Sequence, residues 1–140
     1  MIRGLCHGVF DVIHYGHILH LRAARSLCDH LTVCLTPDEF VNKGPSRPVF
    51  DIERRVIVLS EMRCVDEVIV GQGPEVALNA LATVKPDIYF KGDQYQSIDH
   101  PGFHRELQFC AANLIEVMFT QEPTYSSTEA LRRLKEAANV

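Results

Sequence analysis

Three features are missing from this sequence, and each absence argues against a class of protein. No apolar run reaches the roughly 18 residues that span a bilayer, and the amino terminus lacks the charged segment, apolar core and small-residue cleavage site of a secretion signal. The five cysteines include no C-x-x-C pair, so neither a disulfide framework nor a zinc site is indicated. The formal net charge of −4 lacks the basic excess of a general nucleic-acid binder. We expect a cytoplasmic protein without membrane or nucleic-acid partners.

The order of apolar segments predicts the fold. With 140 residues, 46% of them hydrophobic, the chain suits a single domain, residues 1–140, that buries its own core. Strands are expected at residues 1–6, 30–36, 66–71, 87–91 and 114–119, and helices at 18–28, 52–62, 74–84, 101–112 and 126–138. Strand and helix alternate without a repeat or a long linker. This pattern predicts an α/β domain with a doubly wound parallel sheet of about five strands.

The segment after the first expected strand carries the strongest signal for function. Residues 8–17 read GVFDVIHYGH and lie where that strand turns into the first helix. In parallel α/β sheets ligands bind at this edge, and the N–H groups at a helix start favour a phosphate. His14 and His17 are three residues apart, so both side chains can lie on one side of the first helical turn. We interpret the segment as a phosphate-binding site.

The same ten residues match the signature G-x-F-D-x-x-H-x-G-H, and the chain resembles the cytidylyltransferase-like nucleotidylyltransferases from Gly4 to about Leu134. The resemblance implies a Rossmann-like fold and displacement of pyrophosphate from a nucleoside triphosphate, with His14 and His17 stabilising the α-phosphate. It also implies nucleotide contacts from Gly8, Val9, Phe10, Asp11 and Gly16. For Asp11 an equal alternative is structural, since its side chain can bind backbone N–H groups and brace the turn.

Two basic residues are expected near the phosphates. The resemblance places Lys43, in the loop after the second strand, and Arg55, in the following helix, against the triphosphate and the acceptor as catalytic residues. Physical chemistry supports such groups, because phosphoryl-type displacement is catalysed mostly by positioning and by neutralising charge. Arg54 competes with Arg55 for this role, and Arg47 is a weaker candidate for binding the acceptor. A solvated surface charge is the ordinary alternative for each.

Two later segments complete the expected nucleotide pocket. Gly92 and Asp93 follow the fourth strand, and Tyr125, Ser126, Ser127 and Thr128 precede the last helix. Hydroxyls at a helix start either cap the helix or hold a phosphate together with its N–H groups. The cytidylyltransferases have the segment R-T-x-G-x-S-T-T here, and this chain keeps the hydroxyl triplet but has Gln121 in place of the arginine. That departure weakens the expectation of an arginine contact at this position.

The nucleotide base is predicted from a mixture of features. Asp93 resembles its counterpart in the G-D-D-W segment of the glycerol-phosphate cytidylyltransferases, whereas Lys91 and Tyr95 resemble the K-G-G-D-Y segment of the adenylyltransferases that make ADP-heptose. The Arg47-Pro48-Val49 segment also resembles the second group. We predict CTP as the nucleotide donor and keep ATP as the close alternative.

The predicted reaction transfers CMP from CTP to a small phosphorylated acceptor, a sugar or polyol phosphate, and releases pyrophosphate. The alternative is adenylyl transfer from ATP to a heptose 1-phosphate or a relative of it. Mg²⁺ is expected with the triphosphate, bridging its oxygens rather than bound by a metal site of the protein. The acceptor is expected to contact loops around residues 42–48 and 95–105. A homodimer is expected from the resemblance alone.

A second class of function also fits part of the sequence. His7, His14, His17 and His20 crowd the first segment, and a group of histidines of this kind is found in metal-binding modules. A non-enzymatic module that binds a metal or senses a nucleotide is therefore the distant alternative.

Overall fold

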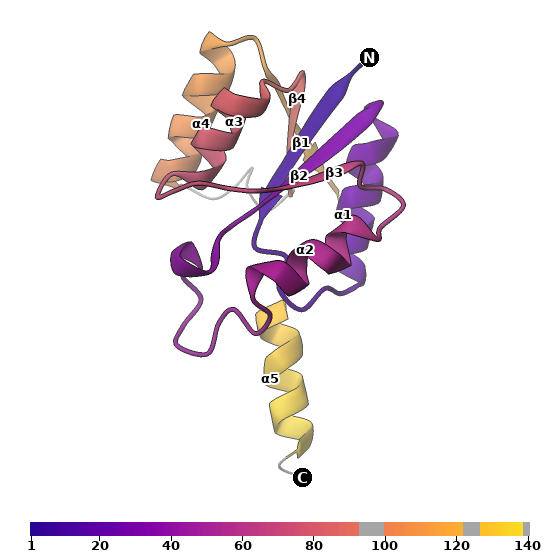
Figure 1. Cartoon of the computed structure of the whole chain (residues 1–140), viewed down its shortest axis with the longest axis vertical. Helices are drawn as coiled ribbons and strands as arrows, with labels where there is room; N and C mark the ends of the chain where they lie inside the picture. The colour runs from indigo at the N-terminus through magenta and orange to yellow at the C-terminus, as the bar shows by residue number, and fades with distance from the viewer. Residues whose placement is uncertain (93–99, 122–126, 139–140) are drawn as a thin grey trace.

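The computed structural model describes residues 1–92, 100–121 and 127–138 (Figure 1). Its strands are β1 (Arg3–Gly8), β2 (His30–Leu35), β3 (Glu67–Val70), β4 (Ile88–Gly92) and β5 (Glu116–Thr120). They form one five-stranded sheet in the order β3-β2-β1-β4-β5, and every pair is parallel. The helices are α1 (Tyr15–Ser26), α2 (Ile52–Ser60), α3 (Val76–Val84), α4 (Pro101–Ala112) and α5 (Ser127–Ala138), with a short helix η1 (Asp38–Phe40).

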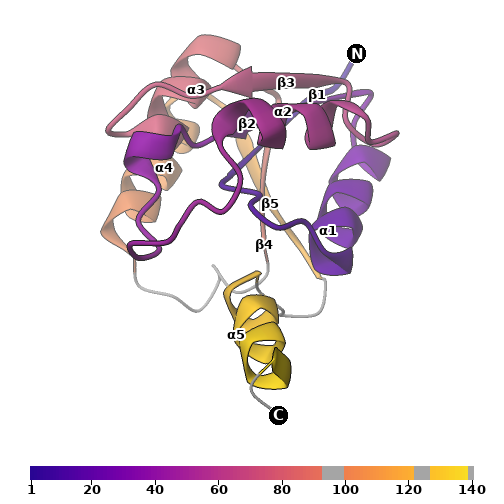
Figure 2. The same ribbon diagram turned by 60° about the horizontal axis from the view of Figure 1, so that its bottom comes forward.

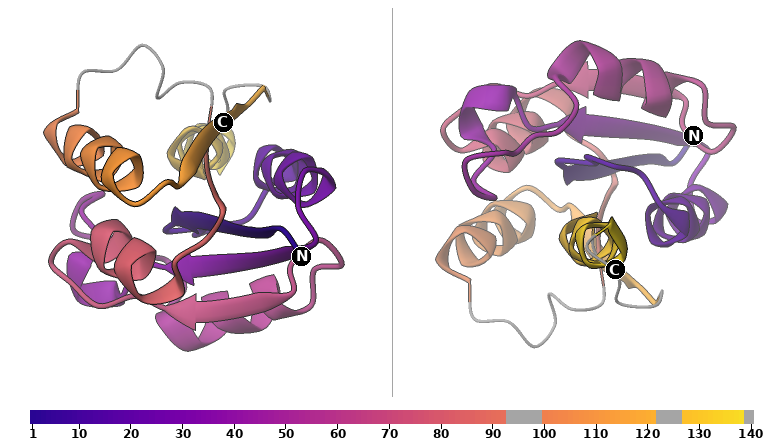
Figure 3. Two further views of the ribbon diagram at one scale, coloured as in Figure 1. Left: turned by 90° about the horizontal axis from the view of Figure 1, so that it is seen from above. Right: turned by 90° about the horizontal axis from the view of Figure 1, so that it is seen from below.

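Four of the helices cover the two faces of the sheet (Figures 1 and 3). Leu21 of α1 and Leu59 of α2 pack on one face with Cys6 and Phe90, whereas Leu81 of α3 packs on the other face. On that second face, the core also contains Leu5, Tyr89, Phe103 and Cys110. Both faces are therefore buried, which explains why the strands read as continuous apolar runs rather than as alternating ones.

The fifth helix lies apart from these layers. Figures 1 and 2 show α5 projecting from the edge of the sheet at which the strands end, and only its first residue, Ser127, is buried. The chain therefore uses the start of this helix, rather than its length, to contact the domain.

The strand order creates a crevice at one place on this edge. From β1 the chain moves outward to β2 and β3, and then returns to add β4 and β5 on the other side of β1. The connections after β1 and β4 therefore leave the sheet toward opposite faces. Ligands of such sheets bind outside the carboxyl ends of the strands at this switch point. In this chain, residues 8–17 follow β1 at that place.

The predicted doubly wound parallel sheet is confirmed, with several boundaries moved by one to three residues. The last strand begins at Glu116 rather than at Leu114, because Leu114 has a positive φ of 57° and is 94% exposed. Among the described residues, no helix is long and apolar enough to cross a bilayer.

The glycine directly after β3 yields the first prediction. A Cβ atom at Gly71 would collide with Cγ1 of Val76 and would lie 3.0 Å from Sγ of Cys34. We expect Gly71→Ala to lower the free energy of unfolding by about 1–3 kcal/mol, because a packed core resists added volume. Denaturant unfolding measures this change. The neighbouring exposed change Val70→Ala is the control and should cost about 0.5 kcal/mol or less; equal effects of the two changes would contradict the packing argument.

Candidate active site

The turn between β1 and α1 has an unusual backbone. Phe10 and Val12 have φ angles of 51° and 53°, a left-handed conformation that costs free energy for any residue with a Cβ atom and most for a β-branched one. The ring of Phe10 packs into the core, and a Cβ atom at Gly8 would lie 2.8 Å from that ring. Gly8 therefore makes room for the turn, and other contacts must hold the turn in place.

Asp11 supplies the first of these contacts. Its buried carboxylate accepts hydrogen bonds from the backbone N–H of Val49 at 2.7 Å and of Phe50 at 3.0 Å, and from Nε of Arg47 at 2.9 Å. Burial alone would raise the pKa of Asp11, but these three hydrogen bonds hold that pKa below its usual value. Of the two expectations for Asp11, the structure places it in the bracing role, and its oxygens are occupied by the protein rather than turned to a nucleotide.

The start of α5 supplies the second contact. The buried hydroxyl of Ser127 donates to the backbone carbonyl of Asp11 and lies 2.8 Å from that of Val12. The hydroxyl of Thr128 accepts a hydrogen bond from Nη1 of Arg47 at 3.0 Å. Ser127 and Thr128 were predicted to bind the nucleotide. In the structure the Ser127 hydroxyl binds the turn, and the Thr128 hydroxyl binds Arg47. Tyr125 and Ser126, which were predicted beside them, lie outside the described residues, as does Asp93.

His14 and His17 cap the first turn of α1. Nδ1 of His14 accepts from the N–H of Gly16 at 3.0 Å, and Nδ1 of His17 accepts from the N–H of His14 at 3.1 Å. A neutral imidazole that accepts at Nδ1 carries its proton at Nε2. The ring centroids are 4.1 Å apart. The capping therefore selects one tautomer for both rings, with the N–H donor on the nitrogen that points away from the backbone.

Both imidazoles are neutral near pH 7. Burial lowers the pKa of His14, and the positive charge of Lys43 lowers it further. Burial, His14 and Lys43 together lower the pKa of His17 to about 4. Each ring is therefore a neutral hydrogen-bond donor at Nε2, a form suited to an oxygen whose negative charge increases during a reaction.

Arg55 differs from its prediction as a phosphate-binding residue. Its guanidinium is 1% exposed and donates to the carbonyls of Phe50, Val9 and Thr36 and to the carboxylate of Asp38. These partners occupy the side chain inside the domain, so it joins the residues directly after β1 and β2, and η1, to the start of α2. Arg54, its competitor, is exposed and pairs with Asp51. Asp38 was missed because nothing in the sequence links it to an arginine 17 positions later.

Lys43 is electrostatically linked both to the imidazoles and to Arg47. Lys43 is on an exposed loop, yet partial burial lowers its pKa, Arg47 lowers that pKa further, and Asp11 opposes both effects. The positive charge of Lys43 lowers the pKa of both His14 and His17, so its loop lies within electrostatic range of the two rings. The catalytic role expected for Lys43 stays a prediction.

The three glycines that were predicted to bind the nucleotide, Gly8, Gly16 and Gly92, contribute backbone groups to this edge of the sheet. The carbonyl of Gly8 accepts from the N–H of Thr36 at 3.0 Å, and Gly16 is buried in the first turn of α1. Gly92 ends β4, where it pairs with Thr120 of β5. These positions shape the edge of the sheet around the histidines.

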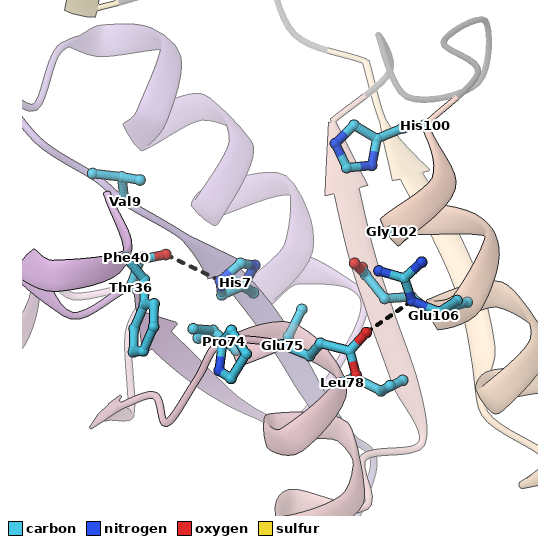
Figure 4. Close-up of a pocket in the computed structure, with 13 residues that line it drawn as sticks. His7, Val9, Thr36, Phe40, Pro74, Glu75, Leu78, His100, Gly102 and Glu106 are labelled. Atoms are coloured by element: carbon cyan, nitrogen blue, oxygen red, sulfur yellow. Dashed lines mark hydrogen bonds and ion pairs between the residues drawn. The ribbon is translucent and has the colours of Figure 1, made fainter. Parts of the chain in front are cut away.

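A pocket of about 290 Å³ adjoins the turn on the α3 and α4 side of the sheet (Figure 4). It is lined by His7, Val9, Thr36, Phe40, Pro74, Glu75, Val76, Ala77, Leu78, His100, Gly102, Arg105 and Glu106. Val9 belongs to both the turn and the pocket lining. The sequence predicted acceptor contacts from residues 42–48 and 95–105. His100, Gly102 and Arg105 of the second segment line this pocket, whereas no residue of 42–48 does.

The pocket combines an apolar wall with a few polar groups. Nε2 of His7 lies 3.1 Å from Oγ1 of Thr36, and burial, assisted by Lys91, lowers the pKa of His7 to about 3. Glu106 accepts a hydrogen bond from the Tyr89 hydroxyl at 2.5 Å. Sequence reasoning considered His7 only as a metal ligand and missed Glu106, because a single carboxylate in a helix carries no pattern.

The crowded histidines of the first segment do not converge on a metal. His7 contacts Thr36, whereas Nδ1 of His20 lies 2.5 Å from Oγ1 of Thr120. Within residues 1–92, 100–121 and 127–138, no group of three or more His, Cys, Asp or Glu side chains is arranged to hold a metal ion.

Acid should weaken the folded state through three histidines. The pKa values of His7, His17 and His20 fall from 6.5 to about 3, 4 and 4, so between about pH 6.5 and pH 4 the unfolded chain binds more protons than the folded one. The free energy of unfolding should therefore fall as pH is lowered through this window, by up to about 1.4 kcal/mol per pH unit for each histidine. Denaturant unfolding at several pH values measures this slope. His20→Gln should flatten it, and an unchanged slope in that variant would contradict the assignment.

Comparison with known proteins agrees with this geometry. The model of the cytidylyltransferase-like family matches residues 5–133. An FAD synthase from Pyrococcus horikoshii is 37% identical over 114 residues, which are 81% of this chain and 76% of that protein. The bifunctional protein HldE of Granulibacter bethesdensis is 39% identical over 101 residues, 71% of this chain, but the chain spans only 21% of that protein.

Solved structures give the same result. A lipopolysaccharide core biosynthesis protein from Thermoplasma volcanium superposes with a TM-score of 0.70 at 33% identity, covering 90% of this chain and 99% of that one. A pantothenate synthetase from Thermus thermophilus superposes with a TM-score of 0.61 at 16% identity. The match covers 89% of this chain and 57% of that one, and it shows the fold alone. Since the family model covers residues 5–133, the histidine turn included, the chain belongs to the cytidylyltransferase-like family and is a nucleotidyltransferase.

Proposed function

We propose that the protein transfers AMP from ATP to the phosphate of a small phosphorylated acceptor and releases pyrophosphate. An oxygen of the acceptor phosphate attacks the α-phosphorus in line, the bond from that phosphorus to the bridging oxygen breaks, and the electron pair leaves with pyrophosphate. The observation that carries the proposal is the pair of Nε2–H donors on His14 and His17, 4.1 Å apart between ring centroids at the switch point of the sheet. Two fixed neutral donors suit the oxygens of one phosphate that gains charge.

The comparisons favour ATP over the CTP predicted from the sequence. The FAD synthase relative matches four fifths of this chain, and its named product contains an adenylate. Two HldE relatives match 71% and 66% of this chain, which supports the resemblance to the adenylyltransferases that make ADP-heptose. CTP is therefore kept as the alternative donor, and a sugar or polyol phosphate remains the proposed acceptor.

The other residues have separate roles in this proposal. Lys43, a point charge on an exposed loop, approaches the triphosphate, whereas Arg55 acts as a positioning residue that holds the carbonyl of Val9. Mg²⁺ arrives with the nucleotide as part of the substrate, because the one carboxylate at the turn, Asp11, is already satisfied by the protein. The contacts of Gly92, Asp93, Tyr125 and Ser126 with the nucleotide, and the homodimer, stay predictions.

The pocket beside the turn is the proposed site of the acceptor. Because Val9 lines it and also belongs to the histidine turn, a molecule in the pocket would lie next to a phosphate held by His14 and His17. Its apolar wall excludes water. Its few polar groups, among them His7 and Glu106, can form hydrogen bonds with hydroxyls of the acceptor.

The two nitrogens of His17 can be tested separately. His17→Asn keeps an acceptor near the position of Nδ1 but loses the distant donor, and His17→Gln places an amide N–H near the position of Nε2. We expect His17→Asn to lower kcat by about a hundredfold or more, as the loss of one such donor does elsewhere, and His17→Gln to retain more activity.

Pyrophosphate release with a panel of sugar and polyol phosphates measures kcat for both variants. Circular dichroism checks that they fold, and His104→Asn, on the exposed side of α4, is the matched control. Full turnover by the Asn variant would show that the imidazole does not act on the phosphate.

The donor nucleotide can be identified without knowing the acceptor. A ligand at a hundred times its Kd adds about 2.7 kcal/mol to the stability of the folded state. We expect ATP with Mg²⁺ to raise Tm by several degrees, and CTP with Mg²⁺ to raise it less. A larger shift with CTP would replace AMP by CMP in the proposal, and no shift with either would contradict nucleotidyl transfer.

A further inference from the structure

Glu106 has one carboxylate oxygen that the protein does not use. Its Oε1 accepts a hydrogen bond from the Tyr89 hydroxyl at 2.5 Å and lies 4.0 Å from Nζ of Lys91. Its Oε2 accepts no hydrogen bond from the residues that the structure describes. Because the side chain lines the pocket beside the turn and is 14% exposed, Oε2 is open to a molecule bound there.

A structural role accounts for only one of the two oxygens. Tyr89 and Lys91 are both buried, so the hydroxyl needs a hydrogen-bond partner and the ammonium needs a negative charge nearby. Both contacts go to Oε1 of Glu106. A mostly buried charged oxygen without a donor is costly, and folded proteins seldom leave one unless a bound molecule completes it. Oε2 therefore needs a donor that the protein does not supply.

His7 adds a second acceptor to the same pocket. The Thr36 hydroxyl donates to the carbonyl of Gly8 at 3.4 Å, and its oxygen lies 3.1 Å from Nε2 of His7. Since the hydroxyl has one hydrogen, its oxygen accepts from Nε2–H, and the neutral ring keeps a lone pair at Nδ1. His7 projects from β1 and Glu106 from α4, and both line the pocket (Figure 4). A ligand in this pocket therefore meets two hydrogen-bond acceptors.

The charges around Glu106 favour a neutral donor. A second phosphate or a carboxylate offers only acceptor oxygens, and the carboxylate of Glu106 would repel it. A cation gains little, because Lys91 already offsets the charge of Glu106. Glu75 and Arg105, which also line the pocket, pair with each other at 2.8 Å. A hydroxyl brings a hydrogen without a charge, so a hydroxylated group is the chemistry that fits.

We infer that Glu106 determines the specificity for the acceptor, by accepting a hydrogen bond at Oε2 from a hydroxyl at the uncharged end of that molecule. Tyr89 and Lys91 are positioning residues, because they act on the acceptor only through the carboxylate that they hold. Nδ1 of His7 accepts from a second hydroxyl. This inference rests on the proposed function, in which the phosphate of the acceptor reaches the two histidines of the turn and the rest of the acceptor fills the pocket.

Glucose 1-phosphate, ribose 5-phosphate and glycerol 3-phosphate are the probes, each with analogues that lack one hydroxyl, and pyrophosphate release gives kcat and KM. Glu106→Gln removes the charge and keeps the size of the side chain. With the acceptor that has the highest kcat/KM, we expect this variant to lose about tenfold to a hundredfold in kcat/KM, mostly through a higher KM. With the analogue that lacks the bound hydroxyl, wild type and variant should agree within about twofold, because the pair no longer interacts.

Two further variants distinguish positioning from a general effect on structure. Glu61→Gln is the matched control, because Glu61 is exposed at the end of α2 and does not line the pocket, and its KM should equal that of the wild type. Tyr89→Phe removes one group that holds the carboxylate, so we expect a smaller rise in KM that depends on the same hydroxyl. A lower Tm with an unchanged KM would make Tyr89 purely structural. Should Tyr89→Phe not fold, Glu106→Gln decides.

The outcomes separate the inference from the proposed function. An unchanged KM in Glu106→Gln, or equal losses with the acceptor and with every analogue, would overturn the inference alone. Faster turnover of fructose 1,6-bisphosphate or phosphoethanolamine would also overturn it, since each places a charge at the far end, and nucleotidyl transfer would stand. Turnover of none of these probes would overturn the inference together with the sugar or polyol acceptor. Failure of ATP and CTP to raise Tm would overturn nucleotidyl transfer itself.

Discussion

The carboxylate of Asp11 is the group on which the rest of the site depends. The turn between β1 and α1 contains two residues with positive φ, one on each side of Asp11, and such a turn persists only where surrounding contacts over-determine it. The carboxylate meets this need with two backbone N–H groups and Arg47, while Ser127 holds the carbonyl side of the same residue. Two distant segments, residues 47–50 and the start of α5, thus fix a turn of a few residues, and that turn sets the direction in which α1 begins.

Rigid placement of α1 makes its caps chemically useful. In most helices a serine, threonine or aspartate caps the first turn, and here two imidazoles do so. Because each uses Nδ1 as the capping acceptor, each presents an N–H at Nε2, and burial with a nearby lysine keeps both rings neutral. In the proposed mechanism, local structure and catalysis therefore use opposite nitrogens of the same rings. Because the N–H donor at Nε2 belongs to the imidazole, a serine or aspartate cap would preserve the helix but not this donor.

The arginines show where reasoning from the sequence succeeds and where it fails. The motif of residues 8–17 has a local pattern, and its position after a strand predicted its place at the carboxyl edge of the sheet, where the structure has it. Arg47, Arg54 and Arg55 have no such pattern, because a basic residue in a loop or an early helical turn reads the same whether it is exposed, buried or bound to substrate. The structure buries Arg55 among carbonyls, exposes Arg54, and places Arg47 between the turn and α5.

By itself the sequence determined the order of strands and helices, the parallel sheet, and the location of the histidine pair, because these depend on periodicity and on contacts between near neighbours in the chain. Only the tertiary structure decided that Asp11 braces the turn, that Ser127 joins it from 116 positions away, and that a pocket forms between β1, η1, α3 and α4. Those features come from contacts between distant segments. The residues next to a side chain in the sequence do not indicate which distant residue it will contact. That partner is therefore known only from the folded structure.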